Sequence, residues 1–162
     1  VWTLLIAYMQ FLAVSALWKD APKEIAAMDF KSNKFINDVF SLGNDKTGLN
    51  VSILILQVLF LLHYERYEDI FDKKDALRRY IYRYLYSKEN ERSRTFMTML
   101  LRMIEQEFSF AKTIEKTKRL QTQLASLNMN YRANLGGNEI VDYEILWDWV
   151  LNTLKTKWPK AA

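Results

Sequence analysis

The sequence predicts an all-α protein, and three observations lead to this prediction. Its 162 residues include only four glycines and two prolines, whereas a sandwich or barrel of short strands needs turn residues at roughly every tenth position. Half of the residues are apolar, which excludes a disordered or low-complexity chain. The apolar residues also recur three and four positions apart, which is the spacing of one helix face. We therefore expect one domain over residues 1–162 with about six to eight helices.

The first predicted helix runs from Trp2 to about Trp18 and has no charged residue. An uncharged run of this length is compatible with a membrane span. However, no basic cluster flanks the run to set an orientation, and small or polar residues recur along one side of the helix. These residues are Thr3, Ala7, Gln10 and Val14. We expect a packing helix between neighbours of different bulk, and we do not expect a membrane partner.

Two shorter elements and a loop follow this helix. A short helix is expected near residues 23–28, and a further helix over Ser32–Phe40 with the serine as its cap. The clearest loop of the chain is Gly43–Gly48. A phosphate-binding loop would place its Lys-Ser/Thr pair after the second glycine, but here Lys46-Thr47 comes before it. We therefore expect a turn between helices at this loop.

The segment Val51–Leu62 is predicted to be the central helix. It is apolar on all sides, whereas a surface helix has one apolar stripe and one polar face. Asn50 directly precedes it and belongs to the residue types that favour the helix cap. The other helices must therefore surround this segment.

Further helices are predicted after the central one. The segment Asp72–Tyr86 has an apolar stripe at helical spacing, which comprises Leu77, Tyr80, Ile81, Tyr84 and Leu85. Ser93 can cap the next helix, whose stripe comprises Phe96, Met97, Leu100, Leu101 and Ile104. A more polar helix is expected over Phe110–Leu127, and a long loop over Asn128–Asn138.

The last helix has the clearest signals at both ends. Asp142 stands at its start and Pro159 follows its end. Glu144 in the first turn and Lys155 and Lys157 in the last turn complement the helix dipole. Its apolar stripe comprises Tyr143, Leu146, Trp147, Val150, Leu151, Leu154 and Trp158.

The spacing of the predicted helices favours stacked antiparallel hairpins. Two consecutive pairs begin near residues 51 and 93, which gives a period of roughly 40 residues, within the range of helical-repeat proteins. The two pairs are not visibly alike in sequence. The spacing therefore leaves two architectures open, a fragment of an α-solenoid and an irregular helical bundle.

Four stretches resemble the C-terminal part of large, uncharacterised bacterial proteins with tetratricopeptide-like helical repeats. The stretches are AYMQFL (Ala7–Leu12), KFINDVFSLGNDKTGLNVSILILQVLFLL (Lys34–Leu62), DALRRYIYRYL (Asp75–Leu85) and YEILWDWVL (Tyr143–Leu151), with Asn37, Lys46, Gly48 and Asn50 as polar landmarks. The resemblance implies stacked helical hairpins but no activity. Together with a start at Val1 rather than at methionine, it leads us to expect a C-terminal part of a longer protein.

The residue inventory provides no predicted catalytic, cofactor or metal site. The chain has no cysteine and one histidine, which excludes thiolate chemistry and multi-histidine zinc sites. His63 ends the central helix without a sequence partner. The acidic residues of the pairs Glu105/Glu107 and Asp142/Glu144 are two positions apart, so they point to different sides of a helix. We expect a protein that is not an enzyme, and the absence of cysteine favours the cytoplasm.

Basic charge is concentrated between Lys73 and Arg119, with thirteen basic and six acidic residues. Opposite the predicted apolar stripe of Asp72–Tyr86, guanidinium groups alternate with aromatic rings, a combination that can bind a protein partner or nucleic acid. This candidate surface comprises Arg78, Arg79, Tyr82, Arg83 and Tyr86. A solvated face is the competing interpretation, with Asp75 paired to Arg79 four positions on.

A second candidate surface lies on the last helix, where Ile145 and Trp149 are one turn apart on the side away from the predicted stripe. A tryptophan is seldom left in water, so we expect another part of the chain or another molecule to cover it.

The function favoured by these features is a non-enzymatic scaffold for protein–protein interaction. Two alternatives stay open at this point. One is a nucleic-acid-binding helical domain that uses Arg78, Arg79 and Arg83, and the other is an end cap of a larger enzyme. The sequence specifies neither the partner nor the oligomeric state.

Overall fold

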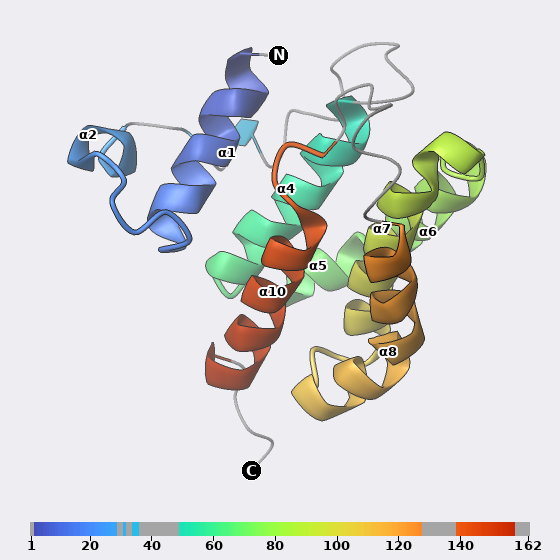
Figure 1. Ribbon diagram of the computed structural model, residues 1–162. Helices are drawn as coiled ribbons and strands as arrows, with labels where there is room; N and C mark the ends of the chain where they lie inside the picture. Colours follow the sequence, from blue (N-terminus) through green and yellow to red (C-terminus); the bar gives the residue numbers. More distant parts are fainter. Residues whose placement is uncertain (1, 29–30, 32–33, 36–48, 128–138, 158–162) are drawn as a thin grey trace.

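Every element in the described part of the chain is helical (Figure 1), which confirms the all-α fold class and is consistent with six to eight helices. The computed structural model describes residues 2–28, 31, 34–35, 49–127 and 139–157. The predictions for residues 43–48 and 128–138 therefore lie outside the described residues, and the helix predicted over residues 32–40 is described only at Lys34 and Phe35, which are helical, with Phe35 buried. The elements are α1 (Trp2–Val14), α2 (Lys23–Ala26), α4 (Leu49–His63), α5 (Tyr67–Asp72), α6 (Lys74–Tyr84), the 3-10 turn η2 (Lys88–Asn90), α7 (Glu91–Glu105), α8 (Phe110–Ser126) and α10 (Tyr143–Lys157).

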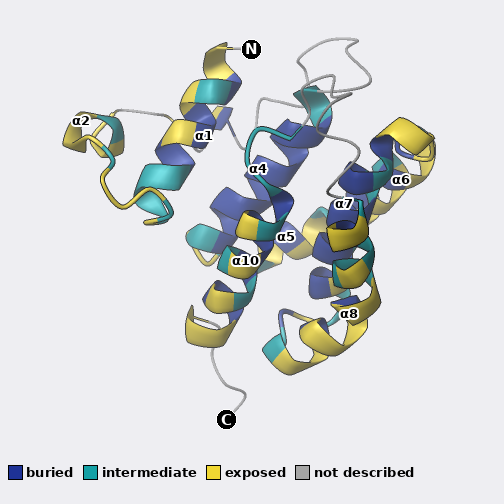
Figure 2. Cartoon of the chain, in the orientation of Figure 1, coloured by how far each residue is buried: buried dark blue, intermediate teal, exposed yellow. Residues whose placement is uncertain are grey.

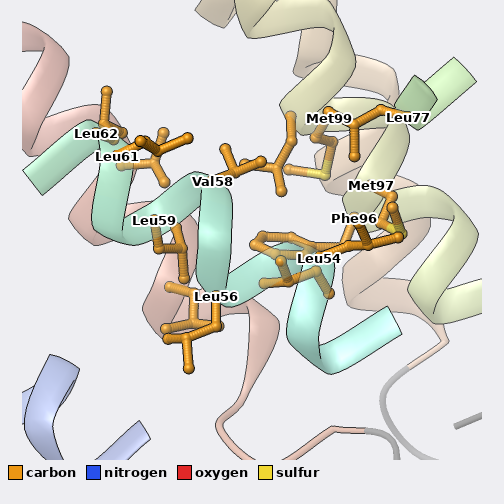
Figure 3. Close-up of a cluster of buried hydrophobic side chains, with 14 of the residues drawn as sticks. Leu54, Leu56, Val58, Leu59, Leu61, Leu62, Leu77, Phe96, Met97 and Met99 are labelled. Atoms are coloured by element: carbon orange, nitrogen blue, oxygen red, sulfur yellow. The ribbon is translucent and has the colours of Figure 1, made fainter. Parts of the chain in front are cut away.

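Helix α4 forms the centre of the molecule, as predicted. All of residues 51–62 are buried, and the helix is covered along its length in Figure 2. It packs against α1, α5 and α10, and in Figure 3 its Leu54 and Val58 lie in one cluster with Phe96 and Met99 of α7. The helix begins at Leu49, so Asn50 lies in the first turn and not at the predicted cap position.

Helix α1 is shorter than predicted, because the chain leaves the helix after Val14. Ala16 has a left-handed φ of 60°, and the Trp18 N–H donates to the Leu12 carbonyl at 2.9 Å. The buried side of α1 is joined to α4 by a hydrogen bond from the Tyr8 hydroxyl to the Ser52 carbonyl at 3.1 Å. No helix in the described ranges combines the length and hydropathy that a bilayer-spanning segment needs.

The helix predicted over Asp72–Tyr86 is confirmed as α6, whereas the short helix α5, which ends at Asp72 directly before it, was not predicted. Helix α5 has six residues and buries only Ile70, so it produces no apolar period that a sequence could show. The α6 stripe is confirmed in part. Leu77, Ile81 and Leu85 are buried, and the two tyrosines between them are partly buried.

Helices α7, α8 and α10 confirm the remaining predicted helices, but not the cap at Ser93. Helix α7 begins at Glu91, so Ser93 lies inside it, where its Oγ is 2.8 Å from the buried Tyr143 hydroxyl. All five apolar residues predicted for the α7 stripe are buried. The predicted α10 stripe is buried over five residues, Tyr143, Leu146, Trp147, Val150 and Leu154, while Leu151 is partly buried and Trp158 lies outside the described residues.

Helices α4 and α7 end in the same C-terminal motif, with glutamate where glycine is usual. Glu65 and Glu107 have φ of 58° and 53°. The next residue then bonds back across five positions, Arg66 N–H to the Leu61 carbonyl at 2.9 Å and Phe108 N–H to the Met103 carbonyl at 3.0 Å. This is the Schellman arrangement, in which a left-handed residue satisfies the last helical carbonyls. The helices therefore stop without a glycine signal in the sequence.

The helices pack around α4 and do not stack in a linear series. Helix α7 packs against both α6 and α8, and α10 packs against both α8 and α4. Lys157 Nζ at the end of α10 donates to the His63 carbonyl at the end of α4, at 3.3 Å. In a solenoid each repeat contacts only its neighbours. The long-range contact between α4 and α10 therefore favours the irregular bundle of the two predicted architectures.

Candidate functional site

The outward face of α6 carries the candidate residues predicted from the sequence. Because Leu77 and Ile81 face the core, the positions opposite them face solvent. All five predicted residues are exposed, Arg78, Arg79, Tyr82, Arg83 and Tyr86. The exposed fractions of Tyr82 and Tyr86 are 76% and 65%, which is high for aromatic side chains.

Tyr86 is held between an aromatic ring and a guanidinium group. The Tyr82 ring meets it edge-on, with centroids 5.6 Å apart. On α7, the Arg94 guanidinium lies 5.1 Å from the Tyr86 ring centroid. Arg94 Nη1 also donates to the carbonyls of Leu85 and Tyr86, at 3.4 Å each. Arg94 therefore fixes the end of α6 and the Tyr86 ring together. We call Arg79, Tyr82, Arg83, Tyr86 and Arg94 the α6 surface.

Arg94 was not among the predicted residues, because it lies on another helix, α7. Its place beside Tyr86 depends on how the turn over residues 87–90 returns the chain along α6. The only sequence signal is the shortness of this connection, which requires the start of α7 to lie near the end of α6.

Arg78 differs from the other arginines of α6, because it is bound to two carboxylates. Its Nη1 donates to Asp75 at 2.8 Å and its Nη2 to Glu105 of α7 at 3.0 Å. Asp75 thus pairs with Arg78, three residues later, and not with Arg79, four residues later, which corrects the predicted pairing. Arg79 and Arg83 form no ion pair with any residue in the described part of the chain. Arg78 joins α6 to α7, while the other two arginines point to solvent.

Glu105 is the acidic residue where α6 and α7 meet. Burial acts to raise its pKa, but hydrogen bonds and charge from Arg102 and Arg78 outweigh burial and lower the pKa. Arg102 Nη1 donates to it at 2.6 Å. Glu105 therefore stays ionised and, together with Asp75, offsets the charge of Arg78.

The two residues of the second predicted surface, Ile145 and Trp149, differ in their exposure to solvent. Ile145 is exposed, whereas Trp149 is partly buried because the Phe11 ring packs against it edge-on at 5.0 Å. Part of the chain itself therefore covers Trp149, one of the two predicted outcomes. The second surface belongs to α10, which packs against α4 and α8, whereas α6 packs against α5 and α7, so the structure does not bring the two predicted surfaces together.

His63 lies at the end of α4, 6.4 Å from the Trp149 ring and 5.1 Å from the Tyr64 ring between centroids. Burial lowers its pKa, Lys157 lowers it further, and Glu65 acts in the opposite direction. Three or more histidine, aspartate or glutamate side chains do not gather into a metal-binding group anywhere in the described ranges. His63 is part of the packing between α4 and α10.

Arg92 forms a buried charge cluster that the sequence analysis missed. Its exposed fraction is 5%. Nε and Nη2 bind both oxygens of Glu139 at 2.8 and 2.6 Å, and Nη1 and Nη2 bind Glu144 at 3.1 and 2.9 Å. Nη1 also donates to the Leu124 carbonyl of α8 at 2.9 Å. The one signal in the sequence was an arginine one turn before Phe96, on the buried stripe of α7.

This cluster is structural, because the guanidinium group holds both carboxylates. Glu139 also accepts a hydrogen bond from the Tyr143 N–H at 2.9 Å, which fixes the start of α10. The cluster therefore joins α7, α8 and α10 at one point.

A scan against protein-family models and searches of curated proteins and of solved structures find no match for the chain. The resemblance to bacterial proteins with tetratricopeptide-like repeats therefore stays a prediction.

Proposed function

We propose that the chain is a non-enzymatic helical module for protein–protein interaction and that the α6 surface is where a protein partner binds. The observation that carries the proposal is the exposure of Tyr82 and Tyr86 beside arginines that have no described acidic partner. Tyrosine and arginine are enriched among residues that dominate binding energy at protein interfaces. A tyrosine has few rotatable bonds, so it gives a large contact area at a small cost in conformational entropy.

The fixed geometry of this surface supports the same proposal. Tyr86 is held by Tyr82 and by Arg94, so a partner would meet a rigid aromatic side chain. Binding to a rigid side chain loses less entropy than binding to one that must first be ordered. The tetratricopeptide-like resemblance and a cytoplasmic location belong to this proposal and are compatible with it.

Site-specific cross-linking in cells tests the proposal. A photoreactive amino acid replaces Tyr82, and in a control chain it replaces Lys118, an exposed residue of α8. The proposal expects one defined protein cross-linked at position 82, lost when Arg83→Glu is added, and a different or empty pattern at position 118. The same set of proteins from both positions, unaffected by Arg83→Glu, would contradict it.

Nucleic-acid binding is the second candidate, favoured by the alternation of arginine and tyrosine along α6. If the chain binds nucleic acid, its affinity for a single-stranded oligonucleotide should fall steeply as the salt concentration rises. Arg79→Glu should abolish this binding. Affinity that is weak at all salt concentrations, or insensitive to this substitution, rejects it.

A further inference from the structure

The basic groups of the α6 surface lie on a short stretch that is flanked at both ends by residues of mixed charge. At the N-terminal end, Asp75 and Glu105 neutralise Arg78. Beyond the C-terminal end, Glu89 and Glu91 follow within five residues of Tyr86, with Lys88 between Tyr86 and Glu89. The guanidinium groups of Arg79, Arg83 and Arg94 form no ion pair in the described part of the chain, and the next cation before Arg78 toward the start of α6, Lys74, lies 4.3 Å from the Phe71 ring centroid.

This limited length discriminates between kinds of anionic partner. Arg79 and Arg83 are four positions apart on a helix, so their backbone positions are about 6 Å apart. A nucleic-acid strand carries a phosphate at every nucleotide and would run beyond this distance onto residues of mixed charge, where the carboxylates offset the attraction of the neighbouring basic groups. A peptide can place two or three carboxylates on the arginines and no charge beyond them.

The guanidinium group of Arg94 is already held in a position from which it can bind a carboxylate. Its Nη1 donates to two carbonyls and its guanidinium carbon lies 5.1 Å from the Tyr86 ring centroid, so its position is set before binding. Its Nε and Nη2 donate no hydrogen bond to another residue in the described ranges. A planar guanidinium group binds a carboxylate through two parallel hydrogen bonds, and a fixed one loses less entropy in doing so.

From these observations we infer that the α6 surface binds a short acidic segment of its protein partner. Arg83 and Arg94 bind the carboxylates, and Tyr82 packs against an apolar side chain of the same segment. This inference depends on the proposed function and names the chemistry of its partner.

Binding of defined probes to the full chain tests the inference. The probes are a short helical peptide with glutamates one turn apart and a central leucine, the same peptide with glutamines, and an oligothymidylate of equal length. The glutamate peptide is expected to bind, and the other two to bind at least tenfold more weakly. Arg83→Ala should weaken binding of the glutamate peptide about tenfold, which is the effect expected for the loss of one hydrogen bond to a charged group. Arg119→Ala removes the same charge from the exposed side of α8 and should change binding less than about twofold.

Arg94 needs a variant that keeps the fold. Arg94→Lys retains the charge but cannot form two parallel hydrogen bonds, so the inference expects weaker peptide binding with an unchanged melting temperature. If Arg94→Lys lowers the melting temperature, the effect of Arg83→Ala on peptide binding tests the inference instead, because Arg83 has no described structural partner.

Three results would overturn the inference. These are tighter binding of the oligothymidylate than of the glutamate peptide, equal binding of the glutamate and glutamine peptides, and equal effects of Arg83→Ala and Arg119→Ala. The cross-linking experiment separates this failure from failure of the proposed function. If position 82 captures a protein but the glutamate peptide does not compete, only the inference fails, whereas absence of any captured protein contradicts both.

Discussion

At the residue scale, position on α6 decides which tyrosines support the fold and which remain for binding. Tyr80 and Tyr84 lie on the stripe beside the core and are partly buried, with ring centroids 5.0 Å apart. Tyr82 and Tyr86 lie on the outward side. The same residue type thus serves two purposes two positions apart, because successive helical residues point about 100° apart.

This division predicts different effects of two alanine substitutions. Tyr82→Ala should leave the free energy of unfolding within about 0.5 kcal/mol of the unmodified chain while abolishing binding of the glutamate peptide described above. Tyr80→Ala should lower the free energy of unfolding by about 2 kcal/mol, since it removes aromatic area from the core. Urea denaturation measures both values, and a larger loss for Tyr82→Ala than for Tyr80→Ala would show that the assignment is reversed.

Arg92 is predicted to be the most sensitive charged residue of the fold. Arg92→Ala leaves the carboxylates of Glu139 and Glu144 without their guanidinium partner, which costs about 3 kcal/mol or more when the group is buried. Arg102→Ala removes an arginine whose pair with Glu105 is half exposed and should cost less than about 1 kcal/mol. Similar losses for the two variants in urea denaturation would contradict a structural role for the buried cluster.

His63 gives a pH-dependent prediction that one signal can follow, because it is the single histidine of the chain. Burial and Lys157 lower its pKa below the usual 6.5. The folded state therefore takes up this proton less readily than the unfolded state, so the contribution of His63 to stability is present above pH 6.5 and is lost as the pH falls below it. Proton NMR should show a midpoint below 6.5 that rises in Lys157→Gln. A midpoint at or above 6.5 contradicts the packed position of His63.

At the element scale, the sequence predicts the long helices well and their ends poorly. The α4 segment is apolar on all sides, and the α7 and α10 stripes bury almost every residue expected, because burial of a helix requires a periodic pattern that can be read locally. The ends at Glu65 and Glu107 could not be predicted, since the left-handed conformation there depends on backbone hydrogen bonds and not on a glycine. The short helix α5 was not predicted, because only Ile70 of its six residues is buried.

These ends provide a stability prediction. A left-handed residue other than glycine costs about 1–2 kcal/mol, and the greater entropy of glycine in the unfolded chain offsets part of this. Glu65→Gly and Glu107→Gly should therefore each raise the free energy of unfolding by about 0.5–1 kcal/mol. Glu65→Ala and Glu107→Ala are the matched controls and should show no gain. Glycine variants less stable than the alanine variants would contradict the left-handed assignment.

At the scale of the whole molecule, contacts between distant segments complete both the fold and the site. Phe11 of α1 packs between Phe60 of α4 and Trp149 of α10, with centroid distances of 5.4 and 5.0 Å. Four members of the α6 surface could be predicted from the sequence, because the face opposite an apolar stripe is known once the stripe is known. Arg94 and the Arg92 cluster could not, because they depend on which helices become neighbours.

The most direct measurement of the central claim is amide hydrogen exchange of the full chain, alone and with the protein captured by cross-linking at position 82. Exchange is expected to slow on binding over residues 79–94, where the α6 surface lies, and to stay unchanged in α1 and in the exposed half of α8. Slower exchange in α1 or α10 with no change over residues 79–94 would place the partner on another face and contradict the account.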